Sequence, residues 1–322
     1  MRPSPGQAGP YSHHTEHRID VAADPDAVYA LVSDVTRWPG AFGPTIHAQR
    51  LEFDGRDERI QLWATANGEP KTWISRRELL PEQRRVSFRQ EVSQSPVAAM
   101  RGEWIIEQLP GGGAGVLLTH DYTPVEDVPD AAEWIARAVD RNSEAELASL
   151  RAAVEGGDRR GDLELDFEDT VVIDGPLAAV YAFLYEAGEW PVRLPHVSRL
   201  ELREESAGLQ YLEMDTKAVD GNIHTTASIR VCFPQERIVY KQLKLPPLLD
   251  LHLGCWTLTA TPEGRVTASS RHVIRINPEK VSLLGEGKTV QDAKAFVRNA
   301  LGTNSTATLN HARAFAEAQA RG

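Results

Sequence analysis

Two stretches of the chain carry functional side chains at every second position, and each series ends in an arginine. The first series is Trp73, Ser75 and Arg77, and the second is His224, Thr226, Ser228 and Arg230. Alternate residues of a β-strand point to the same side, so each series would occupy one face of a strand. An arginine inside a protein is costly unless water or a ligand satisfies it. These faces therefore predict polar contacts to a ligand inside a water-filled cavity.

A solvent-exposed face is the alternative interpretation of both series, and two observations argue against it. The residues that alternate with the second series form the mostly apolar set expected of a face that packs on protein: Thr225, Ala227, Ile229 and Val231. Serine and arginine also recur at matched positions, Ser75 with Ser228 and Arg77 with Arg230, in segments that otherwise differ.

The matched positions are part of an internal repeat that runs through the chain. The segment DAVYALVSDVTRWP reappears as AAVYAFLYEAGEWP, which pairs Trp38 with Trp190 at an offset of 152 residues. SRRELLPEQRRV aligns with SIRVCFPQERIV at an offset of 153, and Trp104 pairs with Trp256 further on. A gene duplication explains the preserved order, so we expect both copies to have the same fold.

Each copy begins with a short strand and a helix, continues with several strands and ends in a long helix. Asp24 followed by Pro25 is typical of a helix start. Alternation over residues 60–65, with turn residues between such runs, predicts antiparallel hairpins. Broad apolar stripes predict the final helices over 131–154 and 288–319. The pattern indicates an α+β fold in which a curved antiparallel sheet wraps around a long C-terminal helix and leaves an internal cavity.

Composition divides the chain into two domains and two connecting segments. Residues 1–16 are rich in proline and histidine and are predicted to form a disordered arm. The N-terminal domain is expected over 17–155 and the C-terminal domain over 163–322. The Gly-rich, charged stretch 156–162 is predicted to be the linker between them.

Charge and composition exclude several classes of function. A net charge of -11 argues against nucleic acid as a partner. The apolar stretches are too short to span a membrane, and the absence of an apolar leader predicts a cytoplasmic protein. Cys232 and Cys255 are interpreted as buried free thiols. His13, His14 and His17 fall in the arm without completing a ligand set, so neither a metal nor another cofactor is expected.

Several further residues are weaker candidates for the cavity. Asn142 and Asn304 stand on the final helices, where they could reach a ligand or simply bond to backbone or solvent. Trp63, on a neighbouring strand, is a further candidate for substrate binding. Trp38 and Trp190 are interpreted as core anchors instead of substrate contacts.

The motifs together resemble a known family. Trp38-Pro39, Trp73-x-Ser75-x-Arg77 and Arg141-Asn142-Ser143 make the first half similar to bacterial aromatic polyketide cyclases of the helix-grip (START-like) superfamily. The second half resembles the two-domain aromatase/cyclases of type II polyketide synthases more closely. Its matching motifs are Arg193-Leu194-Pro195-His196-Val197, Glu213-Met214-Asp215-Thr216, His224-Thr225-Thr226, Val231-Cys232-Phe233-Pro234 and Ala300-Leu301-Gly302-x-Asn304-Ser305. The resemblance covers about residues 17 to 320 and implies two tandem helix-grip domains.

The resemblance implies an enzyme that receives a poly-β-ketone from an acyl carrier protein and closes and aromatises its first ring. In two-domain members the chain is typically already reduced at one ketone and is closed between its seventh and twelfth carbons. Arg77 and Arg230 would stabilise the oxyanion, and Ser75 and Ser228 would position a carbonyl or a water. His224 would act as a general acid or base.

The resemblance also implies substrate contacts and a docking partner. Trp73 would form a flat wall where the second copy offers only Thr226, so we expect two pockets of different width and polarity. The tyrosine that single-domain cyclases carry seven residues beyond the Trp of the Trp-Pro is replaced by Thr45 and Val197. Docking of an acidic carrier protein would use local basic patches, with solvated surface arginines as the alternative. The candidates are Arg76, Arg84, Arg85, Arg89, Arg193 and Arg199.

Two alternatives to a pair of working domains stay open. A noncatalytic lipid or polyketide binding protein would share the same cavity. In that case the polar faces that end in Arg77 and Arg230 would be a disadvantage, because aliphatic side chains suit an apolar ligand better. In the other alternative, one copy is structural and only the other is active.

Overall fold

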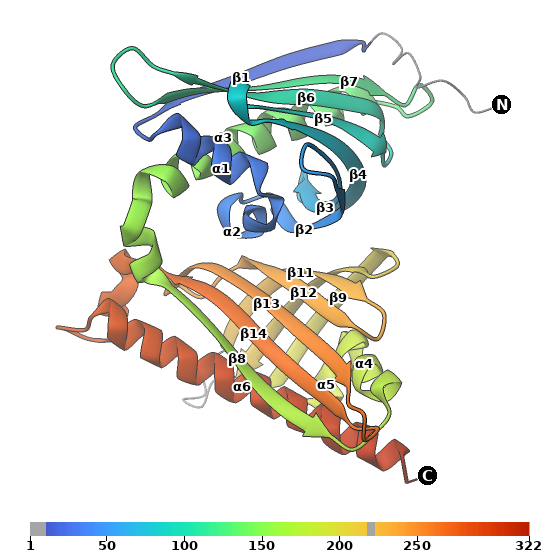
Figure 1. Ribbon diagram of the computed structural model, residues 1–322. Coiled ribbons are helices and arrows are strands. Elements are labelled where there is room, and N and C mark those ends of the chain that lie inside the picture. Colours follow the sequence, from blue (N-terminus) through green and yellow to red (C-terminus); the bar gives the residue numbers. More distant parts are fainter. Residues whose placement is uncertain (1–10, 218–222, 322) are drawn as a thin grey trace. The chain divides into compact units, whose positions relative to one another are not determined.

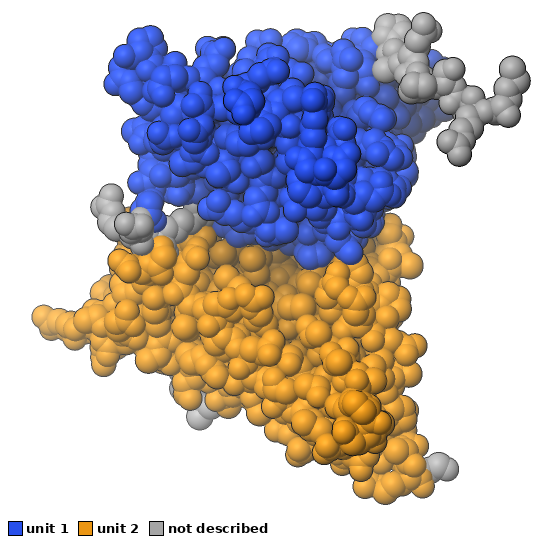
Figure 2. Space-filling view, viewed as in Figure 1, with its two compact units in different colours: residues 1–157 blue, residues 158–322 orange. Residues whose placement is uncertain are grey.

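The computed structural model describes residues 11–217 and 223–321. The chain divides into two compact units, residues 1–157 and 158–322, which Figure 2 shows in two colours. Within the described ranges, no helix is both long enough and apolar enough to cross a membrane.

Unit 1 is a seven-stranded antiparallel sheet with one long helix and two short ones (Figure 1). Its main elements are β1 (His13–Val21), α1 (Pro25–Ser33), α2 (Trp38–Ala41), β2 (Thr45–Phe53), β3 (Asp57–Ala66), β4 (Glu69–Leu80), β5 (Arg85–Val92), β6 (Val97–Gln108), β7 (Ala114–Pro124) and α3 (Ala131–Leu163). The strand order is β1-β7-β6-β5-β4-β3-β2, so the first strand pairs with the last. The Asp24 side chain caps α1 by accepting from the backbone N–H of Asp26, with Pro25 in the first turn.

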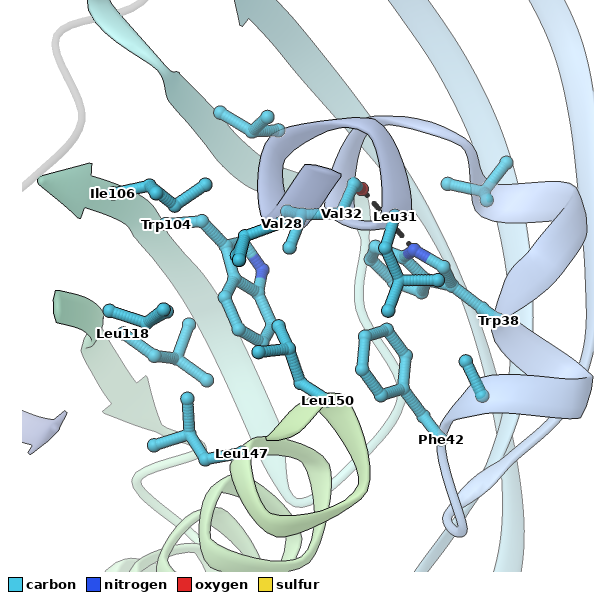
Figure 3. Close-up of a cluster of buried hydrophobic side chains, with 14 of the residues drawn as sticks. Val28, Leu31, Val32, Trp38, Phe42, Trp104, Ile106, Leu118, Leu147 and Leu150 are labelled. Atoms are coloured by element: carbon cyan, nitrogen blue, oxygen red, sulfur yellow. Dashed lines mark hydrogen bonds between the residues drawn. The ribbon is translucent and has the colours of Figure 1, made fainter. Parts of the chain in front are cut away.

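The core of unit 1 lies between the sheet and the helices (Figure 3). Trp38 meets Phe42 edge to face at 5.3 Å between ring centroids, and Phe42 stacks on Trp104 at 6.0 Å. The Trp38 indole N–H donates to the Val32 carbonyl at 3.2 Å. Trp38 therefore packs in the core, as the sequence predicts, and it also lines a cavity of unit 1. Helix α3 closes the core cluster with Leu147 and Leu150.

Unit 2 repeats the same element order with a longer connection before its last helix. Its main elements are β8 (Glu164–Ile173), α4 (Leu177–Tyr185), α5 (Trp190–Arg193), β9 (Val197–Ser206), β10 (Leu209–Lys217), β11 (Ile223–Phe233), β12 (Arg237–Lys244), β13 (Leu249–Ala260), β14 (Val266–Ile276), η4 (Pro278–Leu284) and α6 (Val290–Gln319). The strand order β8-β14-β13-β12-β11-β10-β9 matches that of unit 1. A capping box between Thr289 and Asp292 fixes the start of α6. The helix packs on β8, β14 and α4.

Two of the expected boundaries differ from the structure. The expected arm 1–16 includes His13–Glu16, which belong to β1 and pair with β7 through the whole strand. The Pro and His content indicated disorder, yet these residues are held by backbone pairing; residues 1–10 lie outside the described residues. The expected linker 156–162 falls within the helical span of α3, whose backbone leaves helical geometry at Gly157 (φ 46°, ψ −139°). The division between the units falls at this residue.

Candidate functional site

Unit 2 contains a cavity of about 520 Å³ between its sheet and α6. Five of the residues predicted for the site line it, namely His224, Thr226, Ser228, Arg230 and Asn304. The first four come from alternate positions of β11, so the strand directs one face into the cavity as the spacing predicts. Trp190, which was interpreted from the sequence as a core anchor instead of a substrate contact, lines the cavity too. Most of the surface of the cavity is apolar, with wall residues such as Leu212 and Met214, which suits an extended organic ligand.

Arg230 lies in this cavity, and two of its three guanidinium nitrogens have no hydrogen-bond partner in the part of the chain that the structure describes. Its side chain is buried, its Nη2 donates to the carbonyl of Leu184, and its guanidinium carbon lies 5.3 Å from the Trp190 ring centroid. Nε and Nη1 are buried without a hydrogen-bond partner among the described residues. Burial lowers the pKa of Arg230 below its usual value. A buried guanidinium with two free donors at a cavity wall is suited to bind a carbonyl or oxyanion oxygen.

The matched arginine of unit 1 has a different environment. Arg77 Nη1 lies 3.0 Å from Glu58 Oε1, an ion-pair contact outside hydrogen-bond geometry, and both side chains are almost fully buried. Glu58 also accepts a 2.7 Å hydrogen bond from Arg50 Nε, and Arg77 Nη2 donates to the Val32 carbonyl at 2.8 Å. Burial lowers the Arg77 pKa to about 10, and the charge of Glu58 opposes that shift. Arg77 is thus held by a carboxylate of its own unit.

The register of the sheets explains this difference between the arginines. Glu58 on β3 faces Arg77 on β4 across the ladder, and Gln210 on β10 faces Arg230 on β11 at the matching position. Gln210 carries no charge, so it gives Arg230 no ion pair. Both Glu58 and Gln210 come from the neighbouring strand, which is why motif spacing along one strand did not find them.

Unit 1 has a smaller cavity of about 140 Å³, and it is lined by only two of the residues predicted for it. Trp73 and Asn142 line it, whereas the described lining includes neither Ser75 nor Arg77. Asn142 is engaged in structure, because its Nδ2 donates to the Thr65 carbonyl at 2.8 Å. The two pockets therefore differ in volume, and the expected differences in width and polarity stay predictions.

Two predicted residues take positions that their proposed roles did not anticipate. Trp63 is buried against His47, with 5.3 Å between ring centroids, and does not belong to the cavity lining of unit 1. Leu62 and Ala64 line that cavity, so strand alternation turns Trp63 to the opposite face. His224 lines the cavity of unit 2, yet it is exposed, which places it at the rim and not beside Arg230 in the interior.

Three cavity residues of unit 2 were missed from the sequence: the half-buried Tyr240 and the buried His252 and His272. They come from β12, β13 and β14, and only the pairing of these strands brings them together. The internal repeat could have revealed them. Aligning the two copies strand by strand outward from the Trp104–Trp256 pair would have placed these polar residues opposite mostly apolar residues of unit 1.

The arginines considered for docking are mostly paired with acids of their own unit. In unit 1, Arg84 pairs with Asp26, Arg76 with Glu91 and Arg85 with Glu103. In unit 2, Arg193 pairs with Glu186, and Arg199 with Asp215 and Glu213. The acid in each pair cancels the positive charge of its arginine at the surface, so these positions are weaker candidates for a basic docking patch.

Comparison with known proteins places this architecture in a family. Residues 12–155 match the family described as "Polyketide cyclase / dehydrase and lipid transport". Over 305 residues the chain is 45% identical to the granaticin polyketide synthase bifunctional cyclase/dehydratase of Streptomyces violaceoruber, covering 94% of each protein. The chain belongs to the polyketide cyclase/dehydratase family. It is also 42% identical to the actinorhodin polyketide synthase bifunctional cyclase/dehydratase of Streptomyces coelicolor, over 95% of this chain and 98% of that protein.

Solved structures support the same assignment for both units. The crystal structure of the di-domain aromatase/cyclase BexL from the BE-7585A biosynthetic pathway superposes with a TM-score of 0.83 at 51% identity, covering 95% of this chain and 99% of that one. For the di-domain StfQ of the steffimycin pathway the TM-score is 0.82 at 35% identity, with 96% and 100% covered. The predicted fold of two tandem helix-grip domains is confirmed, and the chain is an enzyme of the cyclase/dehydratase type.

Proposed function

We propose that this enzyme closes and dehydrates the first ring of a poly-β-ketone carried by an acyl carrier protein, as one component of a type II polyketide synthase. The substrate is a chain reduced at one ketone, and the ring joins its seventh and twelfth carbons. The names of the relatives support the reaction type, and the cavity of unit 2 supports the place where it occurs.

The observation that carries the proposal is the free donor pair of Arg230. First-ring closure is an aldol reaction, in which an enolate carbon attacks a ketone and an alkoxide forms. Nε and Nη1 of Arg230, buried and without a hydrogen-bond partner among the described residues, would stabilise the developing negative oxygen at the wall of a mostly apolar cavity. Ser228, one strand repeat away on the same face, would orient the ketone that is attacked. Thr226 and Asn304 would hold the remainder of the chain, and His224 at the rim would exchange protons with solvent.

The two cavities differ in the substrate that they can contain. A volume of about 520 Å³ is within the range of pockets that bind drug-sized ligands, whereas about 140 Å³ is too small for a folded polyketide. Arg77 is neutralised by Glu58 and Ser75 lies outside the small cavity. We therefore assign the chemistry to unit 2 and a structural role to unit 1.

A tethered substrate requires an opening to the surface. Leu283 and Phe296 line the cavity of unit 2 and keep 63% and 54% of their surface exposed. These apolar side chains mark a mouth between η4 and α6 through which a carrier-bound acyl chain would pass. Apolar surface of this kind favours a chain that arrives from a partner protein.

The experiment is product analysis with a minimal polyketide synthase, a ketoreductase and the purified enzyme. Arg230→Gln is compared with wild type, and Arg203→Gln, a surface arginine paired with Glu201, is the matched control. We expect wild type and control to convert shunt products into one product with an aromatic first ring, and Arg230→Gln to lose this effect. Unchanged shunt products with wild type, together with tight binding of the polyketide, would favour the noncatalytic binding protein.

A further inference from the structure

Four polar side chains form a hydrogen-bonded cluster in the wall of the unit 2 cavity. His252 Nε2 lies 2.9 Å from His272 Nδ1, and His272 Nε2 lies 3.1 Å from Ser270 Oγ. The hydroxyl of Tyr240 lies 3.5 Å from the same His272 Nδ1. Both histidines and Tyr240 line the cavity, and the exposed fraction is 2% for His252 and 3% for His272.

Unit 1 has apolar residues at three of the four matching positions. In the strand ladders of unit 2, Tyr240 faces Gly254, which in turn faces His272. In unit 1, Phe88 faces Gly102, which in turn faces His120. Counting two residues back along each strand matches His252 with Met100 and Ser270 with Leu118. The resulting pairs are Tyr240 with Phe88, His252 with Met100, Ser270 with Leu118 and His272 with His120.

The comparison shows that the sheet does not need this cluster in order to fold. Unit 1 builds the same seven-stranded sheet with Phe88, Met100 and Leu118 in these places. Burying imidazoles and hydroxyls costs free energy that apolar side chains would not cost. Their presence in the larger cavity therefore indicates a role in the chemistry of that cavity.

His252 offers the cavity one free ring nitrogen. Its Nε2 bonds to His272, whereas its Nδ1 is buried without a hydrogen-bond partner among the described residues. If His272 Nε2–H donates to Ser270 Oγ, His272 Nδ1 must accept from His252 Nε2–H, and the lone pair of His252 Nδ1 is left as an acceptor. Ser270 and His272 can thus support the tautomer in which His252 acts as a base.

We propose that His252 is a catalytic acid–base residue of the unit 2 cavity, positioned by His272 and Ser270. This inference rests on the proposed function and adds the group that moves the protons. Nδ1 takes a proton from the methylene carbon between two carbonyls, and the C–H electron pair becomes the enolate that attacks the ketone. The alkoxide formed by ring closure takes this proton from Nδ1–H and becomes a hydroxyl. Nδ1 then takes the second proton of the methylene carbon, the C–O bond breaks as the C=C bond forms, and the leaving hydroxyl takes that proton from Nδ1–H and departs as water.

The surroundings keep His252 in the form that this step requires. Burial lowers the pKa of His252 to about 3 and that of His272 to about 4, so both are neutral at pH 7. When the enolate forms, its negative charge stabilises the new imidazolium, and the Nε2–H bond to His272 spreads the charge away from the cavity. Burial also raises the pKa of Tyr240, so its phenol stays protonated as a donor.

The test replaces His252 by the residue that unit 1 uses at the matching strand position. His252→Met is compared with wild type and with His14→Met, which removes a 54% exposed side chain in unit 1. We expect His252→Met to lower the rate of aromatic product formation by about 100-fold or more, because a positioned acid–base group contributes that much. His14→Met should equal wild type, and His252→Met should retain its melting temperature and its affinity for the aromatic product.

A second measurement follows the proton directly. In D₂O, wild type should exchange the central methylene protons of a short β-diketone that cannot cyclise, and His252→Met should not exceed the background rate. His272→Leu should lower kcat by about 10-fold with little change in KM, and His272→Gln should recover part of that loss because it can still accept from His252.

The outcomes separate this inference from the proposed function. Wild type that cyclises the chain while His252→Met does so equally fast would overturn the role of His252 and leave the proposed function intact. Exchange that persists in His252→Met would overturn it as well. Wild type that yields only shunt products would remove the proposed function, and the inference with it.

Discussion

Arg77 Nη1 lies 3.0 Å from Glu58 Oε1 in unit 1, whereas the arginine at the matching position of unit 2 faces an uncharged glutamine. The change between Glu58 and Gln210 thus distinguishes an arginine with a buried carboxylate 3.0 Å away from an arginine that has an uncharged amide opposite it in the ladder. The duplication has kept the arginine in both units and has given the two copies different environments for it. This difference determines how each unit should respond to substitution.

Removing the acid of the ion pair should destabilise unit 1. In Glu58→Ala, Arg77 keeps its buried positive charge without a carboxylate, and Arg50 loses its partner as well. Breaking a buried pair from one side typically costs about 3–5 kcal/mol, and we expect a loss near the lower limit because Arg50 is partly exposed. Urea unfolding measures this, with the exposed Glu82→Ala as control. A loss below about 1 kcal/mol would show that the pair contributes little.

Removing Arg230 should abolish activity and leave the stability of the protein nearly unchanged, in contrast to removing Glu58. Two of its donors are unpaired in the folded protein, so Arg230→Gln takes away a desolvated charge without leaving another one behind. We expect the free energy of unfolding to stay within about 1 kcal/mol of wild type or to rise, while cyclase activity is lost. Parallel urea titrations and product assays test this; a loss of several kcal/mol would mean that Arg230 serves mainly to stabilise the unit.

Acid should destabilise the protein well before its carboxylates titrate. Burial lowers the pKa of His252 to about 3, of His272 to about 4 and of His120 to about 3. The histidines of the unfolded chain bind protons near pH 6.5, whereas those of the folded protein stay neutral. The contribution of these histidines to the free energy of unfolding is therefore fully present above pH 6.5 and is lost progressively as the pH falls toward 4. Melting temperatures measured from pH 8 to pH 5 should fall, and the fall should be smaller in His252→Met. A melting temperature that is constant over this range would contradict the neutral buried histidines.

Glu146 of unit 1 should show a pH dependence of opposite sign. It lines the small cavity on α3, and burial raises its pKa to about 7. The folded protein therefore holds a proton that the unfolded chain releases above pH 4.5, and this contribution is lost as the pH rises toward 7. Because the side chain keeps part of its surface exposed, we expect Glu146→Gln to gain only about 1 kcal/mol at pH 8 and nothing at pH 4. Equal effects at both pH values would rule out a titrating Glu146.

The repeat and the strand period made much of this structure predictable. Alternation along residues 224–230 placed one face of β11 in the cavity, and the constant offset fixed two copies of one fold. The missing parts depend on which strand lies next to which. Glu58 meets Arg77, and His252 meets His272, only through the register of paired strands, which no spacing along the chain reveals. The first four residues of β1 were assigned to the arm because His13 and His14 resemble a polar tail until β7 is seen to pair with them.

The central claim is that unit 2 performs the chemistry, and blocking each cavity separately tests it most directly. Thr226→Trp places in unit 2 the side chain that unit 1 has at Trp73, and Ala138→Leu fills the small cavity of unit 1 from α3. Both variants are assayed with the minimal polyketide synthase and ketoreductase after their melting temperatures confirm folding. We expect Thr226→Trp to give only shunt products and Ala138→Leu to give the wild-type product. Full activity in Thr226→Trp together with loss in Ala138→Leu would contradict the account and assign the reaction to unit 1.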